Sequence, residues 1–340
     1  MAAQTQKGTH SPAQEIAPLV KGLRDGDISA LSRAITLVES TKKEHEEMAQ
    51  AILQQCMDPD RDTLRIGITG IPGVGKSTFI ERFGKLLTGM GKKLAVLTVD
   101  PTSSSSKGSI LGDKTRMQEL VMDPNAFIRP SPSGNALGGV TRKTRESIVL
   151  LEAAGYDTII VETVGVGQSE TAVHDMVDFF VLLKIAGAGD ELQGIKRGIM
   201  EMAHAIVINK ADGSNVKKTI QAVGEFSRAV ALFAPKENGW VPQVMSCSAL
   251  DNTGIGEVWE CISLYMEKAL ATGYKTQNRQ RQQKKWLYQY MEQYVTAHFF
   301  QHETIRKMLP QFEEQVMQGK KSSFLAAEEL LRLYYQTTAP

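Results

Sequence analysis

Residues 70–78, GIPGVGKST, combine residue types and a spacing that bind phosphate. They match the form G-x-x-x-x-G-K-S, in which glycines let backbone N–H groups turn toward phosphate oxygens. Lys76 is expected to reach the β- and γ-phosphates of a nucleotide, and the Ser77 hydroxyl to bind Mg²⁺. We therefore predict a site for a nucleoside triphosphate, and its residues are Gly70, Ile71, Pro72, Gly73, Val74, Gly75, Lys76, Ser77 and Thr78.

A second motif indicates which base is bound. Asn209, Lys210, Ala211 and Asp212 have the N-K-x-D form and follow the apolar run AIVI. The Asp212 carboxylate can accept from both N1–H and the 2-amino group of guanine, whereas adenine would leave a buried acid unpaired. Asn209 is expected to fix the loop and reach N7, and the stem of Lys210 to cover one face of the ring.

A third motif, Ser248, Ala249 and Leu250, follows the next apolar run, PQVMSC. Its backbone amides are expected to bond the guanine O6. A tract of three residues means little alone, and its weight comes from its place after N-K-x-D. Together these motifs predict GTP and GDP as ligands.

Acidic residues at strand ends are candidates for the metal and for catalysis. Glu162 ends the apolar run DTIIV and is expected to hold Mg²⁺ through water, while the Gly165 N–H can meet a γ-phosphate. Asp100 ends LAVLTVD, so a right-handed crossover places it at the phosphate edge, where it can bind Mg²⁺ or orient the attacking water. Gln168 is the other candidate to position that water.

Two polar segments are predicted to respond to the nucleotide. The first follows Asp100 and contains Asp113, which suits either a metal or switch role or a helix N-cap. The second, AGAGDELQGIK, contains Asp190 and Lys196, whose contacts can change with the nucleotide, and a plain loop explains it equally well.

Other clusters do not support a site. His298 and His302 lie four residues apart but lack a third ligand, so packing or solvent exposure explains them better than a metal. The methionines at 117, 122, 200 and 202 are most simply core residues.

The elements that position these motifs alternate along the chain. Apolar strand-like runs occupy residues 64–69, 94–99, 126–129, 158–161, 179–185, 205–208 and 243–247. Helical spacing occupies residues 78–90, 113–122, 140–154, 194–202, 215–233 and 255–270. This alternation predicts an α/β fold with a mostly parallel central sheet flanked by helices, whose ligands bind at the carboxyl ends of the strands.

Three regions are expected. Residues 1–60 form an N-terminal helical region of two or three elements, with the first 12 or so residues disordered; residues 61–272 form the nucleotide-binding domain. Residues 273–340 form a C-terminal helical arm, in which Pro310 is expected to break the helical pattern. The arm has too many aromatic residues to stand alone, so it must pack on the core or on another subunit.

Bulk composition narrows the class. The 340 residues carry a formal net charge of +1, which gives no support for a nucleic-acid or anionic-membrane partner. No run approaches the roughly 18 apolar residues of a membrane span. Three cysteines without metal spacing fit a reducing compartment, so we predict a cytoplasmic protein; a mature organellar protein whose presequence has been removed fits as well.

With these motifs, the chain resembles the MeaB/ArgK group of P-loop GTPases, which includes the human methylmalonic aciduria type A protein. The most specific stretches are GSILGDKTRM, ETVGVGQSE and AGAGDELQGIKRGIMEMA. The resemblance implies a P-loop GTPase fold with a C-terminal dimerisation arm. It also implies an acidic set around the metal and switches, matched by Asp100, Asp113, Glu162 and Asp190, and a switch lysine, Lys196. PTSSSSKGS and SPSGNALGG depart from the usual pattern, which leaves switch details and partner contacts open.

The resemblance further implies a G-protein chaperone of adenosylcobalamin-dependent methylmalonyl-CoA mutase that gates cofactor loading and protects the enzyme. The site lacks an obvious strong base, which favours slow hydrolysis that a partner accelerates. Alternatives are a chaperone of another acyl-CoA mutase such as isobutyryl-CoA mutase, a P-loop kinase of ArgK type, and a non-catalytic metallochaperone or scaffold. N-K-x-D argues against the kinase, and the lack of a Cys/His cluster argues against the metallochaperone.

Overall fold

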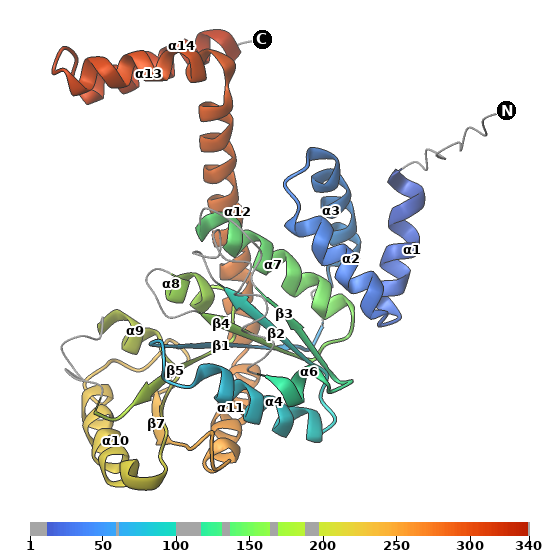
Figure 1. The fold of residues 1–340 in the computed structure, drawn as a ribbon, viewed down its shortest axis with the longest axis vertical. Coiled ribbons are helices and arrows are strands. Elements are labelled where there is room, and N and C mark those ends of the chain that lie inside the picture. Colours follow the sequence, from blue (N-terminus) through green and yellow to red (C-terminus); the bar gives the residue numbers. More distant parts are fainter. Residues whose placement is uncertain are drawn as a thin grey trace. The chain divides into compact units, whose positions relative to one another are not determined.

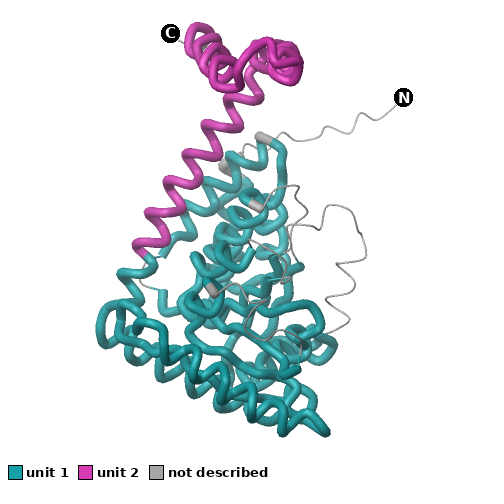
Figure 2. Tube along the Cα trace, turned by 90° about the vertical axis from the view of Figure 1, so that its left-hand side faces the viewer, with its two compact units in different colours: residues 1–279 teal, residues 280–340 magenta. Residues whose placement is uncertain are grey.

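The computed structural model describes six stretches of the chain, residues 12–58, 61–99, 117–130, 137–163, 169–187 and 197–338. The chain divides into two compact units, residues 1–279 and residues 280–340, which are teal and magenta in Figure 2. The first unit contains a β-sheet with its helices, and the described part of the second is helical. None of the helices in these stretches has the length and apolar character that crossing a bilayer requires.

Within the described residues of the first unit, seven strands form one parallel sheet in the order β3-β2-β4-β1-β5-β6-β7. The strands are β1 (Leu64–Gly70), β2 (Leu94–Val99), β3 (Ala126–Arg129), β4 (Thr158–Thr163), β5 (Phe179–Ile185), β6 (Ala205–Asn209) and β7 (Gln243–Ser246). The inner strands are almost continuously buried, because a parallel sheet is covered on both faces. The α/β fold with a parallel central sheet is confirmed.

Helices cover both faces of this sheet (Figure 1). One face carries α4 (Lys76–Gly89), α6 (Gln118–Val121) and α11 (Ile255–Ala271), and the other carries α7 (Leu137–Ala153), α8 (Ser169–His174), α9 (Arg197–Met202) and α10 (Val216–Val230). Alternate residues of one strand enter different layers. In β5, Val181 and Leu183 join the core that includes Phe79 of α4, while Leu182 packs with Phe226 of α10.

The point at which the chain changes face lies at the centre of the sheet. α4 leaves β1 on one face, and α8 leaves the adjacent strand β4 on the other. In open parallel sheets, ligands bind at such a point, outside the carboxyl ends of the strands. The topology therefore directs attention to the ends of β1 and β4.

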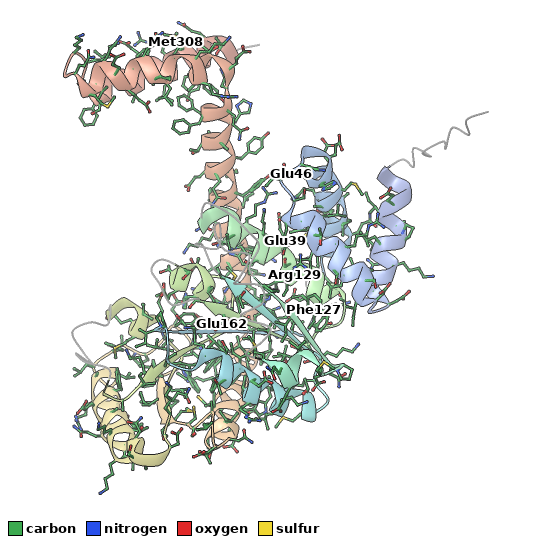
Figure 3. All side chains as sticks on the ribbon, viewed as in Figure 1. Glu39, Glu46, Phe127, Arg129, Glu162 and Met308 are labelled. Atoms are coloured by element: carbon green, nitrogen blue, oxygen red, sulfur yellow. The ribbon has the colours of Figure 1, made fainter. Side chains whose placement is uncertain are left out.

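Three N-terminal helices also belong to the first unit: α1 (Pro12–Arg24), α2 (Ile28–Glu39) and α3 (Lys43–Cys56). They pack on α7 through a small core in which Leu31 and Ile35 are at most 1% exposed. Ion pairs join Arg129 of β3 to Glu39, and Arg142 of α7 to Glu46 at 3.0 Å (Figure 3). The N-terminal helices are thus attached to the sheet's outer strand and to α7.

The second unit contains most of α12 (Tyr274–Gln301) together with α13 (Glu303–Met317) and α14 (Ser323–Thr338). The prediction that Pro310 breaks the helical pattern is wrong, because α13 runs through this residue. An internal proline costs about 3 kcal/mol, but packing of Ile305 and Phe312 against Leu330 of α14 holds both halves of the helix together. The chain turns instead at Gly319, whose φ of +68° suits glycine.

Candidate nucleotide-binding site

The phosphate-binding motif forms the loop between β1 and α4. β1 ends at Gly70 and α4 begins at Lys76. Gly73 and Gly75 have φ values of +81° and +92°, which other residues rarely adopt. These two glycines reverse the chain, so that the N-terminal turn of α4, which contains Lys76, Ser77 and Thr78, faces the loop. Helix N-termini of this kind attract anions.

Two of the loop's glycines are also required by close packing. A Cβ at Gly70 would lie 2.6 Å from the Leu183 carbonyl oxygen of β5. A Cβ at Gly75 would lie 2.8 Å from Asn209 Nδ2. The loop therefore lies directly against the ends of β5 and β6.

Lys76 is oriented across the loop by backbone oxygens. Its Nζ donates to the carbonyl of Gly70 at 2.8 Å and to that of Ile71 at 3.3 Å. The residue is 9% exposed, whereas Ile71, Pro72 and Gly73 are exposed. The ammonium group is thus held against the first two residues of the loop.

Asn209 connects this loop with both guanine motifs. It ends β6 and is 1% exposed. Its Nδ2 donates to the carbonyl of Val74 at 2.9 Å, and its Oδ1 accepts from the Ala249 amide at 3.2 Å. One carboxamide therefore holds the phosphate loop, the N-K-x-D loop and the loop after β7 in a fixed arrangement.

The two guanine motifs are also joined by a side-chain contact. Ser248, which is fully buried, donates from its hydroxyl to Asp212 Oδ2 at 2.6 Å. The same hydroxyl oxygen accepts from the Asp251 amide at 3.0 Å. The sequence suggested only backbone contacts for residues 248–250, so this role of the Ser248 hydroxyl was missed. The sequence signal for this role is that residue 248 is a serine, because an alanine would offer the same backbone amides without a hydroxyl.

The exposed residues of the guanine motifs surround this contact. Asp212 is half-buried, and Lys210 is exposed with a φ of +60°. Leu250 is 71% exposed, although its neighbour Ala249 is buried. The side chains that the sequence assigns to the base thus lie at the surface, above the buried, hydrogen-bonded side chains of Asn209 and Ser248.

Cys247, directly after β7, is also buried and lies beside Asn209. Its Sγ is 3.5 Å from Asn209 Oδ1. Burial, together with Glu257, raises the pKa of the Cys247 thiol to about 12. The thiol is therefore protonated at neutral pH, and a buried thiol of this kind is a poor nucleophile. Nor do the described stretches contain a group of three or more His, Cys, Asp and Glu side chains that could hold a metal.

Glu162 lies near the end of β4, beside the strand that enters the phosphate loop (Figure 3). It pairs with Ile68 of β1 and with Thr98 of β2, and is 7% exposed. Next to it, the Thr163 hydroxyl donates to Thr69 Oγ1 at 2.8 Å. No sequence signal could have found this second contact, because the two threonines are 94 residues apart.

Six of the predicted site residues lie outside the described residues. They are Asp100, Asp113, Gly165, Gln168, Asp190 and Lys196. The other predicted residues come together at the carboxyl edge of the sheet, on loops after β1, β4, β6 and β7.

Comparison with known proteins identifies the family that has this arrangement. The sequence model described as "Methylmalonyl Co-A mutase-associated GTPase MeaB" matches residues 31–304. This chain belongs to the MeaB family of GTPases.

Relatives of this chain are similar over most of their length. A probable GTPase of Mycobacterium tuberculosis is 47% identical over 315 residues, which are 93% of this chain and 94% of the relative. The mitochondrial methylmalonic aciduria type A homolog of Mus musculus is also 47% identical, over 93% of this chain and 79% of the relative. A crystal structure described as that of an LAO/AO transport system kinase superposes with a TM-score of 0.76 at 38% identity, covering 96% of this chain and 99% of that one. The P-loop GTPase fold of the MeaB family therefore extends over most of the chain.

Proposed function

We propose that this MeaB-family protein hydrolyses GTP to GDP and phosphate and uses the nucleotide state to control an adenosylcobalamin-dependent acyl-CoA mutase. Methylmalonyl-CoA mutase is the first candidate client. The observation that carries the nucleotide part is the position of Asn209, whose carboxamide contacts both the phosphate loop and the loop after β7. A guanine nucleotide spanning these loops would find both ends of its site already organised.

The phosphates would occupy the loop of residues 70–78. Backbone N–H groups of the loop and the first turn of α4 supply donors, and Lys76 supplies positive charge. The carbonyls of Gly70 and Ile71 aim the Lys76 ammonium, so that little reorganisation accompanies binding. Such preorganised charge is most effective in the transition state, when negative charge moves toward the leaving oxygen.

The base would be recognised by Asp212, which accepts from N1–H and the 2-amino group of guanine. Ser248 holds one oxygen of this carboxylate, so its direction is set before the base arrives. Lys210 would cover a face of the ring. The Ala249 amide already donates to Asn209, which favours the neighbouring Leu250 amide as the donor to guanine O6.

The chain's own residues fit a magnesium ion at the edge between β1 and β4. Ser77, in the first turn of α4, and Glu162, near the end of β4, offer the oxygen ligands that Mg²⁺ prefers. When bound with GTP, this ion would neutralise charge on the β- and γ-phosphates. We assign Ser77 to direct contact and Glu162 to contact through water, and we retain Asp100 and Asp113 as further candidates.

Hydrolysis requires in-line attack by water on the γ-phosphate. We keep Gln168 and Asp100 as the candidates to position that water, with Lys76 stabilising the developing charge. Neither candidate is a strong base, so we propose slow hydrolysis that the client accelerates. Gly165, Asp190 and Lys196 are proposed to change contacts with the nucleotide state and so to signal to the client.

The names of the relatives support the choice of client. The family description names a mutase-associated GTPase, and the mouse relative is named for methylmalonic aciduria. Isobutyryl-CoA mutase is the alternative client, because the names of the relatives do not exclude a related mutase as the client of this chain. A cytoplasmic location, expected from the sequence, is part of the same proposal.

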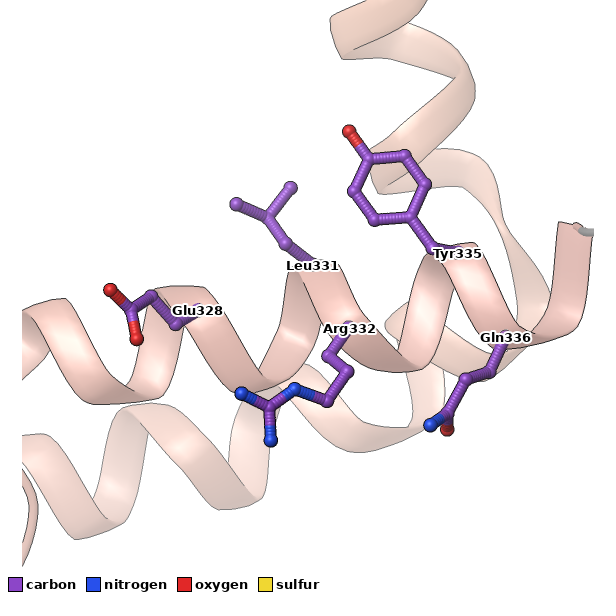
Figure 4. A pocket seen from close by; sticks show the side chains of 5 residues that line it. All are labelled: Glu328, Leu331, Arg332, Tyr335 and Gln336. Carbon is purple, nitrogen blue, oxygen red and sulfur yellow. The ribbon is translucent and has the colours of Figure 1, made fainter.

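The second unit is proposed to join two copies of the chain, as the arm of residues 273–340. A groove of about 610 Å³ between α13 and α14 is lined mainly by apolar residues, among them Phe300, Leu309 and Met317. A second hollow on α14 is lined by Leu331 and Tyr335 together with Glu328 and Arg332 (Figure 4). An acid and a base beside apolar side chains are self-complementary under two-fold symmetry, which suits pairing with a second copy.

A kinase is the second candidate, favoured because the similar crystal structure is described as that of a transport system kinase. The guanine motifs argue against it, because kinases that use GTP are uncommon. Incubation with γ-labelled GTP and candidate acceptors distinguishes the two: release of phosphate alone supports the GTPase, and a labelled acceptor supports the kinase.

The test of the client uses the full-length protein with purified methylmalonyl-CoA mutase and isobutyryl-CoA mutase. We expect one mutase to be retained on the immobilised protein in a manner that differs between GDP and a non-hydrolysable GTP analogue. The same mutase should increase the rate of phosphate release. If neither mutase binds or changes the rate of phosphate release, the chaperone proposal is wrong. The GTPase proposal is tested separately, by the rate of phosphate release from GTP without a mutase.

A further inference from the structure

β1 and β4 separate at the site, and a pair of side chains holds them together there. The ladder between the two strands runs as far as Ile68 and Glu162. One residue further along each strand, the Thr163 hydroxyl donates to the Thr69 hydroxyl oxygen at 2.8 Å. This bond therefore continues the connection between β1 and β4 past the end of their backbone ladder.

Both strands keep their outer neighbours at this level. β1 remains paired with β5 as far as Gly70 and Leu183, and β4 remains paired with β2 as far as Val99 and Thr163. The sheet thus opens between its two central strands, at the point where α4 and α8 depart on opposite faces. The two hydroxyls lie at the base of this opening.

The environment makes the bond strong and specific. Thr69 is 1% exposed and Thr163 is fully buried. A buried hydroxyl that loses its partner pays its full desolvation cost, so the two side chains hold each other in one rotamer. Replacing both hydroxyls by methyl groups of the same shape is far less disruptive than removing one.

Each threonine is adjacent to a residue of the proposed site. Thr69 precedes Gly70, whose carbonyl accepts from Lys76. Thr163 follows Glu162, which we assign to the magnesium side of the site. The hydroxyl bond therefore sets the separation between the lysine-bearing loop and the carboxylate-bearing strand.

From this arrangement we infer that Thr69 and Thr163 form a positioning pair for GTP hydrolysis, an inference that rests on the proposed GTPase activity. GDP binding uses the phosphate loop and the guanine loops, which Asn209 organises independently of β4. Hydrolysis in addition requires the end of β4 in register with the phosphate loop. Loss of the bond should therefore lower the catalytic rate much more than the affinity for GDP.

Thr163→Val in the full-length protein tests this separation. A misplacement of about 1 Å at the reacting groups can cost on the order of 10²-fold in rate, and the loss of one hydroxyl should cause a smaller shift. We expect kcat for GTP to fall about tenfold, while the Kd for GDP stays within about twofold of wild type. Thr163→Ser keeps the hydroxyl and should restore kcat.

The double variant Thr69→Val/Thr163→Val provides a second measurement. If the two hydroxyls act through one bond, its kcat should be no lower than that of Thr163→Val and well above the value expected from multiplying the two single effects. Thr158→Val is the matched control, because Thr158 is a fully buried threonine at the other end of β4 and bonds Asp157 at 2.9 Å. It should leave kcat unchanged.

The outcomes distinguish this inference from the proposed function. A wild-type protein without GTPase activity would overturn the proposed function and this inference together. With an active wild type, the inference is overturned if Thr163→Val retains full kcat or if Thr163→Ser loses as much as Thr163→Val. The inference is also overturned if the kcat of the double variant equals the product of the two single effects. A parallel fall of GDP affinity and kcat in Thr163→Val would overturn it as well and would indicate that the pair is purely structural.

Discussion

The two edges of the same sheet use buried polar groups in different ways. At the amino edge, Arg65 of β1 donates to both oxygens of Glu152 at 2.8 and 2.9 Å, and Arg279 donates to both oxygens of Asp178. At the carboxyl edge, Lys76 is held by carbonyls and Asn209 by backbone groups. The arginines at the amino edge thus bind carboxylates, whereas two backbone carbonyls orient the Lys76 ammonium group.

This difference separates stability from activity along single strands. Arg65 and Gly70 lie in the same strand, but the first belongs to an ion network and the second to the proposed phosphate loop. Substitutions at the amino edge should therefore change the free energy of unfolding, and substitutions at the carboxyl edge should change nucleotide binding and hydrolysis.

The largest effect is expected for Lys76→Met. Removing a preorganised donor to transition-state charge costs about 10²–10³-fold in kcat, and we expect the upper end because Lys76 carries a full charge. Phosphate release under saturating GTP measures it. Lys85→Met on the same helix is the control, since Lys85 pairs with Asp123 away from the loop. A Lys76→Met protein with a wild-type rate would refute the assignment of the carboxyl edge as the active one.

The next effect concerns stability at the opposite edge. Asp178→Asn removes the carboxylate that binds Arg279 at 2.6 Å and leaves Glu152 at 3.8 Å, so we expect a loss of about 3 kcal/mol in the free energy of unfolding. GDP affinity should be unchanged at temperatures where the variant is folded. Denaturant unfolding measures the loss, and Asp62→Asn is the control, because the Asp62 side chain is 83% exposed in its pair with Lys275.

The same carboxylate predicts a pH dependence. Burial by itself raises the pKa of Asp178, but Arg279 and Arg65 outweigh it and hold the pKa below the usual value. Its stabilisation is therefore complete above the unfolded pKa of about 4 and is lost as the pH falls through the lower folded value. Unfolding experiments below pH 4 should show a steeper loss for wild type than for Asp178→Asn, and equal slopes would contradict this account.

Base selectivity should change to a smaller extent. Asp212→Asn removes a charged acceptor, which is worth roughly 10–100-fold in affinity. GTP should bind more weakly by that factor, and xanthosine triphosphate should bind better than it does to wild type. Competition binding with both nucleotides measures the change, and unaltered GTP affinity would exclude Asp212 as the guanine acceptor.

The smallest effect is expected for Ser248→Ala. The Ser248 hydroxyl orients Asp212 without touching the base in this proposal, so its loss should weaken GTP about tenfold at most. Combined with Asp212→Asn, it should add little, because the two residues act through one contact. A full additional loss in the double variant would show that Ser248 contacts the nucleotide itself.

Local pattern predicted much of the fold. The bounds of β2, β3 and β5 agree with the apolar runs of the sequence. For β2 and β5 the reason is that buried parallel strands are nearly continuous apolar segments. Pro310 shows the limit of local rules: its intrinsic cost argued for a helix end, but contacts between α13 and α14 outweighed that cost.

By itself, the sequence determined the phosphate loop, the guanine motifs and the alternation that makes a parallel sheet. Each depends on residue types that are close in the chain: glycines that permit a tight reversal, a lysine at a fixed offset, an acid after a buried strand. The tertiary structure alone decided the strand order and the partners of these residues. The Thr69–Thr163, Ser248–Asp212 and Arg279–Asp178 contacts join positions 94, 36 and 101 residues apart. No local pattern encodes such pairs, because they exist only once the order of the strands has brought distant segments to the same edge of the sheet.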